Sequence, residues 1–291
     1  MINPTASSKT VPERKMVEVR TFSGRDVEFA VRSCRTIGWG YLSSDFERYL
    51  KSEPGGSFVA EWDGKPVGHV FSVNYGTIGW IGMLVVLPEF RERGIGALLT
   101  KTAIDCLYSN GVDTIWLESV PKAITLYRRL GFKDAFHCLR LRKSHDIGAK
   151  LSYVNGVEAM KAEDTEEIAS FDAAYYGANR AKTISLLYQE NPKLCFVKRI
   201  GPSLLGYAMC RSTETGYRIG PCTCNPDYPE VAEELLLRCI AKLGDEAEIS
   251  VGTPVRCKDG LQILKELGFE LRSSSLRMYL GKPGHQGEPR G

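Results

Sequence analysis

The sequence predicts a mixed α/β fold (α+β, with a mixed sheet) that occurs twice, the second copy being degenerate. Strand-like and helix-like segments alternate along the first half, which is typical of this class. Short motifs then recur in the same order at an offset of 137 or 138 residues, which indicates two copies of one fold. The glycine-bearing junction of the first copy has no glycine at the matching place in the second, so that copy is expected to have lost a function.

Hydrophobic periodicity predicts the elements of the first copy in order. Alternating or continuous apolar residues predict strands at 16–22, 57–62, 66–74, 77–88, 114–119 and 136–143. Apolar residues at helical spacing predict helices at 24–37, 43–52 and 94–109, and a short helix within 122–132 that ends at Gly131. The Asp63–Gly64–Lys65 turn joins two of the strands into a hairpin, because Asp-Gly suits the tight turns of hairpins.

Two repeated motifs and one break in the pattern divide the chain. Leu-Gly-Phe, six residues and Leu-Arg-Leu at 130–141 match Leu-Gly-Phe, six residues and Leu-Arg-Met at 267–278. Between the copies, Gly, Ser and Asn interrupt the periodicity, which indicates a linker. The predicted division is a disordered tail at 1–15, domains at 16–146 and 156–281 separated by a linker at 147–155, and a second disordered tail at 282–291.

Composition excludes several classes of protein. The net charge is only +3 and no Lys/Arg block stands out, so we expect no nucleic-acid partner. No apolar run approaches the roughly 18 residues of a membrane span, and the polar N-terminus lacks the apolar core of a signal peptide. Nine scattered cysteines suit free thiols in a reducing cytoplasm, and their spacing predicts no metal site. The sequence leaves open whether the protein is a monomer or a homodimer.

The stretch LPEFRERGIGALLTK, residues 87–101, marks the change from strand to helix. Free N–H groups and the dipole of a helix start attract anions, and glycines let a phosphate approach the backbone. The stretch lacks the Lys-Ser/Thr pair of a Walker A loop and the third glycine of the dinucleotide fingerprint. It therefore predicts a different phosphate or pyrophosphate loop, with a solvated glycine turn as the alternative.

Arg91-Glu-Arg-Gly94-Ile-Gly96 fits the pattern Gln/Arg-x-x-Gly-x-Gly/Ala, and AITLYRRLGF follows at 123–132. With both motifs in that order, residues 16–143 resemble the GNAT superfamily of acyl-CoA-dependent N-acetyltransferases. The resemblance implies acetyl-CoA as co-substrate, with its pyrophosphate on the loop and its pantetheine arm on the preceding strand. The residues that it assigns to coenzyme A are Leu84, Val86, Arg91, Glu92, Arg93, Gly94, Ile95, Gly96 and Ala97.

The resemblance also assigns the proton donor. Tyr127 matches the family's tyrosine, which protonates the leaving thiolate; the alternative is a half-buried helix aromatic with its hydroxyl in water. The family's usual glutamate on the strand before the loop is missing from GWIGMLVV. Glu118 on the next strand is a candidate base, unless it faces solvent or pairs with an arginine. His69 is a further candidate, with a structural histidine as the alternative.

The segment GWGYLSSDF, residues 38–46, is predicted to line the acceptor pocket. Trp39 and Tyr41 would form apolar walls, unless they belong to the core. Asp45 would recognise a cationic amine, with capping of a helix as the alternative.

The second copy lacks both functional marks. NPDYPEVAEELLL at 225–237 replaces the glycine loop with glutamates, and Leu264 stands at the position of Tyr127. This copy resembles the C-terminal GNAT-like domain of two-domain family members, and we expect it to close the acceptor site without a coenzyme site of its own. Its Asp172 and Arg180 either reach a substrate or form an internal ion pair.

These observations predict an acetyltransferase that moves an acetyl group from acetyl-CoA to a primary amine, in a small metabolite. Protein lysine or a protein N-terminus is the alternative acceptor. A non-catalytic acyl-CoA sensor or partner-binding protein, and a generic nucleotide-phosphate binder, are the alternative functions.

Overall fold

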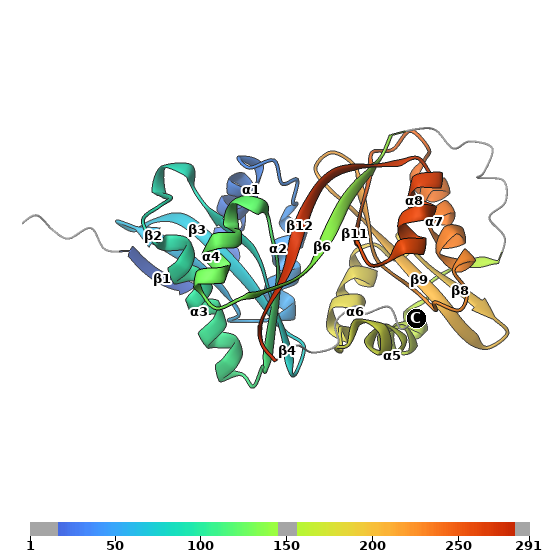
Figure 1. Ribbon diagram of the computed structural model, residues 1–291, viewed down its shortest axis with the longest axis horizontal. Helices are drawn as coiled ribbons and strands as arrows, with labels where there is room; N and C mark the ends of the chain where they lie inside the picture. Colours follow the sequence, from blue (N-terminus) through green and yellow to red (C-terminus); the bar gives the residue numbers. More distant parts are fainter. Residues whose placement is uncertain (1–16, 145–155, 283–291) are drawn as a thin grey trace, which may run out of the picture.

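The computed structural model describes residues 17–144 and 156–282, which build one twelve-stranded sheet (Figure 1). The strand order is β1-β2-β3-β4-β5-β12-β6-β11-β10-β9-β8-β7. The first six strands are β1 (Val17–Thr21), β2 (Ser57–Trp62), β3 (Lys65–Asn74), β4 (Ile78–Val86), β5 (Thr114–Ser119) and β6 (Lys133–Lys143). The other six are β7 (Val157–Ala159), β8 (Cys195–Ile200), β9 (Ser203–Ser212), β10 (Tyr217–Cys224), β11 (Ile249–Pro254) and β12 (Phe269–Gly281).

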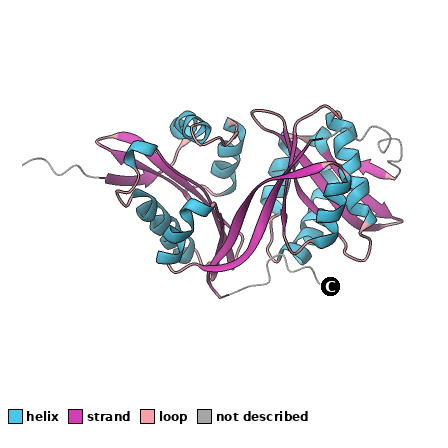
Figure 2. Cartoon of the chain, turned by 45° about the horizontal axis from the view of Figure 1, so that its top comes forward, coloured by secondary structure: helices cyan, strands magenta, loops and turns pink. Residues whose placement is uncertain are grey.

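Helices cover both faces of this sheet (Figure 2). In the first half they are α1 (Val27–Arg35), α2 (Ser43–Ser52), α3 (Ile95–Ser109) and α4 (Ile124–Arg129). In the second half they are α5 (Thr165–Tyr176), α6 (Ala181–Glu190), α7 (Glu230–Leu243) and α8 (Lys258–Glu266). Side chains of α3 and α4 share one apolar core with the sheet, whereas α1 and α2 pack on the other core of this half. The predicted elements of the first copy are confirmed, with ends shifted by a few residues. The predicted tail at 1–15, the linker at 147–155 and all but the first residue of the predicted tail at 282–291 lie outside the described residues.

The hairpin between β2 and β3 shows why these elements form where they do. Asp63 and Gly64 both have positive φ, 50° and 74°, which suits the tight hairpin turns that favour Asp-Gly. Alternate residues of β2 and β3 then enter the two cores, so the hairpin register fixes which side chains are buried.

The two halves repeat one topology, as the internal similarity predicts. In each half an antiparallel meander leads to a parallel pair, β4 with β5 and β10 with β11. A long helix, α3 or α7, connects the strands of each parallel pair. The prediction of two copies of one mixed α/β fold is therefore confirmed.

The sequence does not predict how the halves join. The last strand of the first half, β6, lies beside β11 of the second half. The last strand of the chain, β12, returns between β5 and β6, so each half completes its sheet with a strand of the other. These two long strands cross the middle of the molecule in Figure 1. Neither half has its full sheet without the other.

This exchange predicts a single unfolding transition for both halves. The chain has four tryptophans, Trp39, Trp62, Trp80 and Trp116, and all lie in the first half. Intrinsic fluorescence thus reports on that half, while far-ultraviolet circular dichroism reports on helices and strands of both. We expect the two signals to give coincident denaturant midpoints. Two dichroism steps, only one of which the fluorescence follows, would contradict the prediction.

Candidate functional site

The strand β4 separates from β5 halfway along its length. The two strands pair only from Ile78 with Thr114 to Ile81 with Leu117. Beyond that point Met83 has a positive φ of 52°, and the register of β4 against β3 shifts between His69 and Phe71. A bulge of this kind bends a strand and is frequent beside active sites. Here it leaves the β5-facing edge of β4 without a strand partner from Gly82 onward.

The backbone groups of Leu84 and Val86 face this open edge. The N–H of Leu87 donates to the carbonyl of Val67 on β3, so the residue before it points its polar groups the other way. The carbonyl of Val86 accepts a hydrogen bond of 3.0 Å from Nε of Arg91 instead of a bond within the sheet. The same alternation places Leu84 at the open edge. An extended chain with amide groups can therefore be added here, as in strand addition.

The junction after β4 is a short helical turn, η2 (Pro88–Phe90), followed by the start of α3. Gly94 caps α3 with φ 81°, and a side chain there would find no atom within 4 Å. Within the described chain, none of the backbone N–H groups from Glu92 through Ala97 donates a hydrogen bond. Unpaired donors at a helix N-terminus form a ready anion site. The predicted phosphate loop has the geometry that it needs.

The two arginines of the loop play different parts. Arg91 holds the end of β4 through Val86, and it is exposed. Arg93 lies over the Trp62 ring at 4.9 Å and donates to the carbonyl of Glu89 at 3.3 Å. Both guanidinium groups thus brace the loop and raise the positive potential around its free N–H groups.

Gly96 is the point at which the loop, β4 and α4 meet. A side-chain carbon built on Gly96 would contact Leu126 at 3.5 Å, and Leu84 and Val86 at 3.9 Å. Ile95 beside it is buried and anchors the start of α3 in the core. The strand edge, the helix start and α4 therefore border one site.

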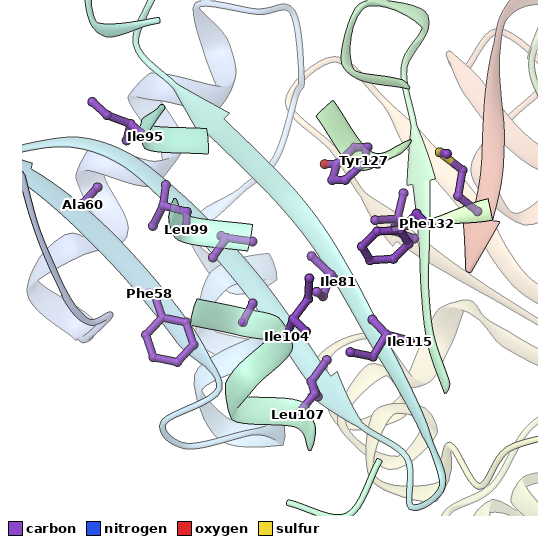
Figure 3. Close-up of a cluster of buried hydrophobic side chains, with 14 of the residues drawn as sticks. Phe58, Ala60, Ile81, Ile95, Leu99, Ile104, Leu107, Ile115, Tyr127 and Phe132 are labelled. Atoms are coloured by element: carbon purple, nitrogen blue, oxygen red, sulfur yellow. The ribbon is translucent and has the colours of Figure 1, made fainter. Parts of the chain in front are cut away.

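Tyr127 follows Leu126 on α4 and is only 6% exposed. Its ring packs edge-on against Phe132 at 5.7 Å, and Figure 3 shows its oxygen directed away from that ring. In the described chain the hydroxyl has no hydrogen-bond partner. Its oxygen is not fully buried either, so part of it is accessible to solvent. Burial raises the pKa of Tyr127, which keeps its hydroxyl protonated at neutral pH.

Glu118 lies on β5 where β4 has diverged, and it is held by two arginines. Its carboxylate accepts from Arg277 at 2.6 Å, from Ser275 at 3.0 Å and from Arg140. Burial alone would raise the pKa of Glu118, but the charges of Arg140 and Arg277 outweigh it and lower the pKa to about 2. A carboxylate so stabilised is a weak proton acceptor, so the geometry favours the arginine-pairing alternative over the base.

This cluster ties β5 to both exchanged strands, and its pKa predicts a pH dependence. The pKa of Glu118 is depressed in the folded state, so its contribution to stability is full above the unfolded pKa of 4.5 and fades as the pH falls to about 2. We expect Glu118→Gln to lower the free energy of unfolding by roughly 3 kcal/mol at pH 7, with a shrinking difference from wild type below pH 4.5.

Denaturant titrations at several pH values measure this difference. The matched control is Glu28→Gln, which removes an exposed helix pair with Arg32 and is expected to change stability by less than about 1 kcal/mol. A deficit of Glu118→Gln that stays constant from pH 7 to pH 3 would exclude the assigned pKa.

Asp45 is buried at 2% exposure and its oxygens are occupied. One oxygen accepts the N–H of Leu42 at 3.0 Å and so caps α2. The other pairs with Arg48 at 2.9 Å and with Arg211 of the second half at 2.5 Å. The capping alternative describes this residue better than amine recognition does.

Trp39 and Tyr41 are half-buried and lie edge to face at 6.1 Å. Both pack against the core beneath α1 and α2 while keeping part of each ring exposed. They can act as apolar walls and core residues at once. The second half approaches this segment, because Glu214 donates its N–H to the carbonyl of Gly40 at 3.1 Å.

Other candidates are structural. His69 is fully buried, its Nε2 lies 2.8 Å from the Ser33 hydroxyl, and burial lowers its pKa to about 3, so it stays neutral. Asp172 and Arg180 form the predicted internal ion pair, with contacts of 2.6 and 2.8 Å.

The matching junction of the second half carries acidic residues where the first half has its glycines. Helix α7 begins with Glu230 and Val231, and Val231 is buried at 2% exposure. The first turn of α7 carries Glu230 and Glu233, whose charges oppose the binding of an anion at this helix start. Leu264, at the position of Tyr127, is a core residue. The second copy thus has acidic residues in place of the glycines and a leucine in place of the tyrosine.

Residues 17–144 and 156–282 contain neither a membrane-spanning helix nor a metal-binding group. No helix there is both long and apolar enough to cross a membrane. No group of His, Cys, Asp or Glu side chains in the same ranges is arranged to hold a metal ion.

A glycine-capped helix start with unpaired N–H groups, beside an opened strand and a helix that carries a buried tyrosine, defines a class of proteins that bind an extended anionic molecule. Comparison with known proteins agrees with this class. The model of the acetyltransferase (GNAT) family matches residues 27–132, and that of an acetyltransferase (GNAT) domain matches residues 168–289. The chain belongs to the GNAT superfamily of acetyltransferases, in a two-domain form, and it is an enzyme of the N-acyltransferase type.

Three relatives illustrate the match. Holothin acyltransferase of Pseudoalteromonas sp. is 25% identical over 254 residues, 87% of this chain and 82% of that protein. The ribosomal protein bS18-alanine N-acetyltransferase of Salmonella typhimurium is 46% identical over 55 residues, 18% of this chain and 37% of that protein. The crystal structure of a putative acetyltransferase from Pyrococcus horikoshii has a TM-score of 0.77 at 22% identity, covering 97% of this chain and 95% of the other.

Sequence reasoning missed the arginines of the site, although a signal was present. Arg140 and Arg277 are the arginines of the repeated Leu-Arg-Leu and Leu-Arg-Met motifs. A charge at the same place in two apolar strands indicates a polar partner in the sheet, and that partner is Glu118.

Proposed function

We propose that the first half transfers an acetyl group from acetyl-CoA to the primary amine of a small metabolite. The observation that carries this proposal is the run of unpaired N–H groups from Glu92 through Ala97 at the start of α3. Those donors suit a pyrophosphate, and the open edge at Leu84 and Val86 suits the amide groups of a pantetheine arm. When bound, acetyl-CoA would supply the thioester carbonyl that the amine attacks.

In this proposal Tyr127 gives its hydroxyl proton to the departing sulfur. Its raised pKa keeps the proton in place until negative charge develops nearby. Glu118 has a low pKa and His69 is sealed and neutral, so we assign neither as the base. Water in the opening between β4 and β5 takes the proton of the amine.

The covering of the acceptor segment supports a small acceptor. Arg211 pairs with Asp45, and Glu190 on α6 pairs with Arg48 on α2 at 2.9 Å, so the second half packs beside residues 38–46. The relative that aligns along most of both halves is named for holothin, whereas the one named for a ribosomal protein aligns over 18% of the chain. A protein chain would need a more open approach.

Release of free thiol from acetyl-CoA tests the proposal, with small amines, amino acids, polyamines and lysine peptides as acceptors. We expect release with small amines and none with peptides. Release with peptides alone would favour a protein acceptor. Tight acetyl-CoA binding with no release for any acceptor would contradict the transfer. Equal displacement by ATP would contradict selectivity for coenzyme A.

A further inference from the structure

Three strands of the molecule's centre bring arginines together on one face of the sheet. Gly252 of β11 lies opposite Arg140 of β6, and Ser250 of β11 lies opposite Arg218 of β10. Since opposed residues share a face and Ser250 and Gly252 are two apart, Arg140 and Arg218 point to the same side. The other side carries Ile219 and Val251, which belong to the core beneath α7 and α8.

Arg218 differs from its charged neighbours because no described residue pairs with it. Arg48, Arg140, Arg211 and Arg277 each contact a carboxylate. Arg218 is half-buried and makes no ion pair, hydrogen bond or ring contact with the described chain. None of its side-chain nitrogens is fully buried without a partner, so the guanidinium is accessible to solvent or to a ligand. Burial, and then the charge of Arg140, lower the pKa of Arg218 to about 10, which still leaves it charged at neutral pH.

Two guanidinium groups converge where Gly252 has no side chain. A carbon built on Gly252 would lie 3.0 Å from Nη1 of Arg140 and 3.2 Å from Nη2 of Arg218. Arg140 holds Glu118 through its Nη2, so its Nη1 remains available. An unpaired charge beside a like charge is costly unless an anion joins them. The pair of nitrogens above Gly252 therefore forms a two-pronged donor for a carboxylate.

This donor pair lies beside the acceptor segment. Arg211 lies opposite Arg218 in the sheet and its guanidinium stands 5.9 Å from the Tyr41 ring, while Arg140 donates to Glu118. Tyr41 is one of the predicted walls, and Glu118 stands where β4 parts from β5. A molecule held at Arg218 would therefore lie on the same sheet as the separation between β4 and β5, where the thioester of acetyl-CoA is proposed to lie.

We propose that the acceptor amine carries a carboxylate, and that Arg218 binds it together with Nη1 of Arg140. This inference rests on the proposed function, since it names the chemical class of the acceptor. Arg218 acts here as a specificity residue that orients the acceptor.

Matched acceptor pairs test the proposal: glycine with glycinamide, 4-aminobutyrate with butylamine, and L-lysine with cadaverine. We expect wild type to favour the carboxylate member of at least one pair by about 10- to 100-fold in kcat/KM, the range of a charge-assisted hydrogen bond. Arg218→Met should remove this preference, and Arg218→Lys should restore part of it. Arg272→Met, at an exposed arginine of β12, is the matched control. A preference that survives Arg218→Met, or none in wild type, would overturn the inference.

A second measurement separates this inference from the proposed function. If wild type acetylates no amine at all, the transfer proposal fails while the anion site is still testable. In buffer free of carboxylate and phosphate, Arg218→Met should melt at a higher temperature than wild type, because it removes an unpaired charge beside Arg140. Glutarate should then raise the Tm of wild type and not that of the variant. A lower Tm for Arg218→Met, or equal shifts with glutarate, would identify Arg218 as a structural residue.

Discussion

Replacing Tyr127 with phenylalanine should lower kcat by about 100-fold and leave the affinity for acetyl-CoA nearly unchanged. The hydroxyl has no partner in the described chain, so its loss breaks no internal hydrogen bond. The ring stays packed against Phe132, so the fold should hold. The substitution thus removes the proton donor alone, which separates turnover from binding.

Single-turnover rates and calorimetric binding of acetyl-CoA measure the two effects. Tyr108→Phe is the control, because Tyr108 is an exposed tyrosine on α3 at 41% exposure and touches no part of the site. An unchanged kcat in Tyr127→Phe would exclude the assigned acid. A parallel loss of binding would assign Tyr127 to cofactor contact instead.

Replacing Gly96 with aspartate should weaken acetyl-CoA binding by roughly 100-fold or more while the protein stays folded. The new side chain would leave the first turn of α3 toward Leu126 and the end of β4, and its negative charge would repel a pyrophosphate at the neighbouring N–H groups. The same charge favours the helix, since an acid in the first turn stabilises an N-terminus by about 0.3–1 kcal/mol. Binding and stability should therefore change in opposite directions.

Gly96→Ala is the matched variant, since it adds a side-chain carbon at ordinary contact distance from Leu126 and adds no charge. It should weaken binding far less than the aspartate does. Thermal unfolding verifies folding, and calorimetry gives the dissociation constants. Equal affinities for wild type and Gly96→Asp would remove the anion from the start of α3.

The local parts of the fold and site were predictable because short stretches of sequence determine them. Asp63 and Gly64 specify a hairpin turn through their allowed φ angles. Gly94 and Gly96 have no side chains, so they leave the backbone N–H groups at the start of α3 uncovered. The loss of the glycine loop and of the tyrosine in the second copy could also be predicted from the sequence, because glutamates replace the loop and Leu264 replaces the tyrosine.

The parts that the sequence did not predict depend on contacts between distant residues. The exchange of β6 and β12 is a choice of strand partner, and either half could have closed on its own strand by pattern alone. The bulge beside Gly82 places its positive φ on Met83, a residue type that does not indicate such a conformation in the sequence. The sequence left open whether Glu118 is a base, faces solvent or pairs with an arginine, because its partners, Arg140 and Arg277, are 22 and 159 residues away. The sequence did not indicate a role for Arg218, because its position near Arg140 depends on how the strands pair in the sheet.

Transfer of radiolabel tests the central claim most directly. Acetyl-CoA labelled in its acetyl group is incubated with the protein and, separately, with the small-molecule and the denatured protein fractions of a cell extract. The account predicts label in an amide of the small-molecule fraction for wild type, and a strong loss of it with Gly96→Asp. Label in the protein fraction alone, or label that stays on coenzyme A in both, would contradict the account.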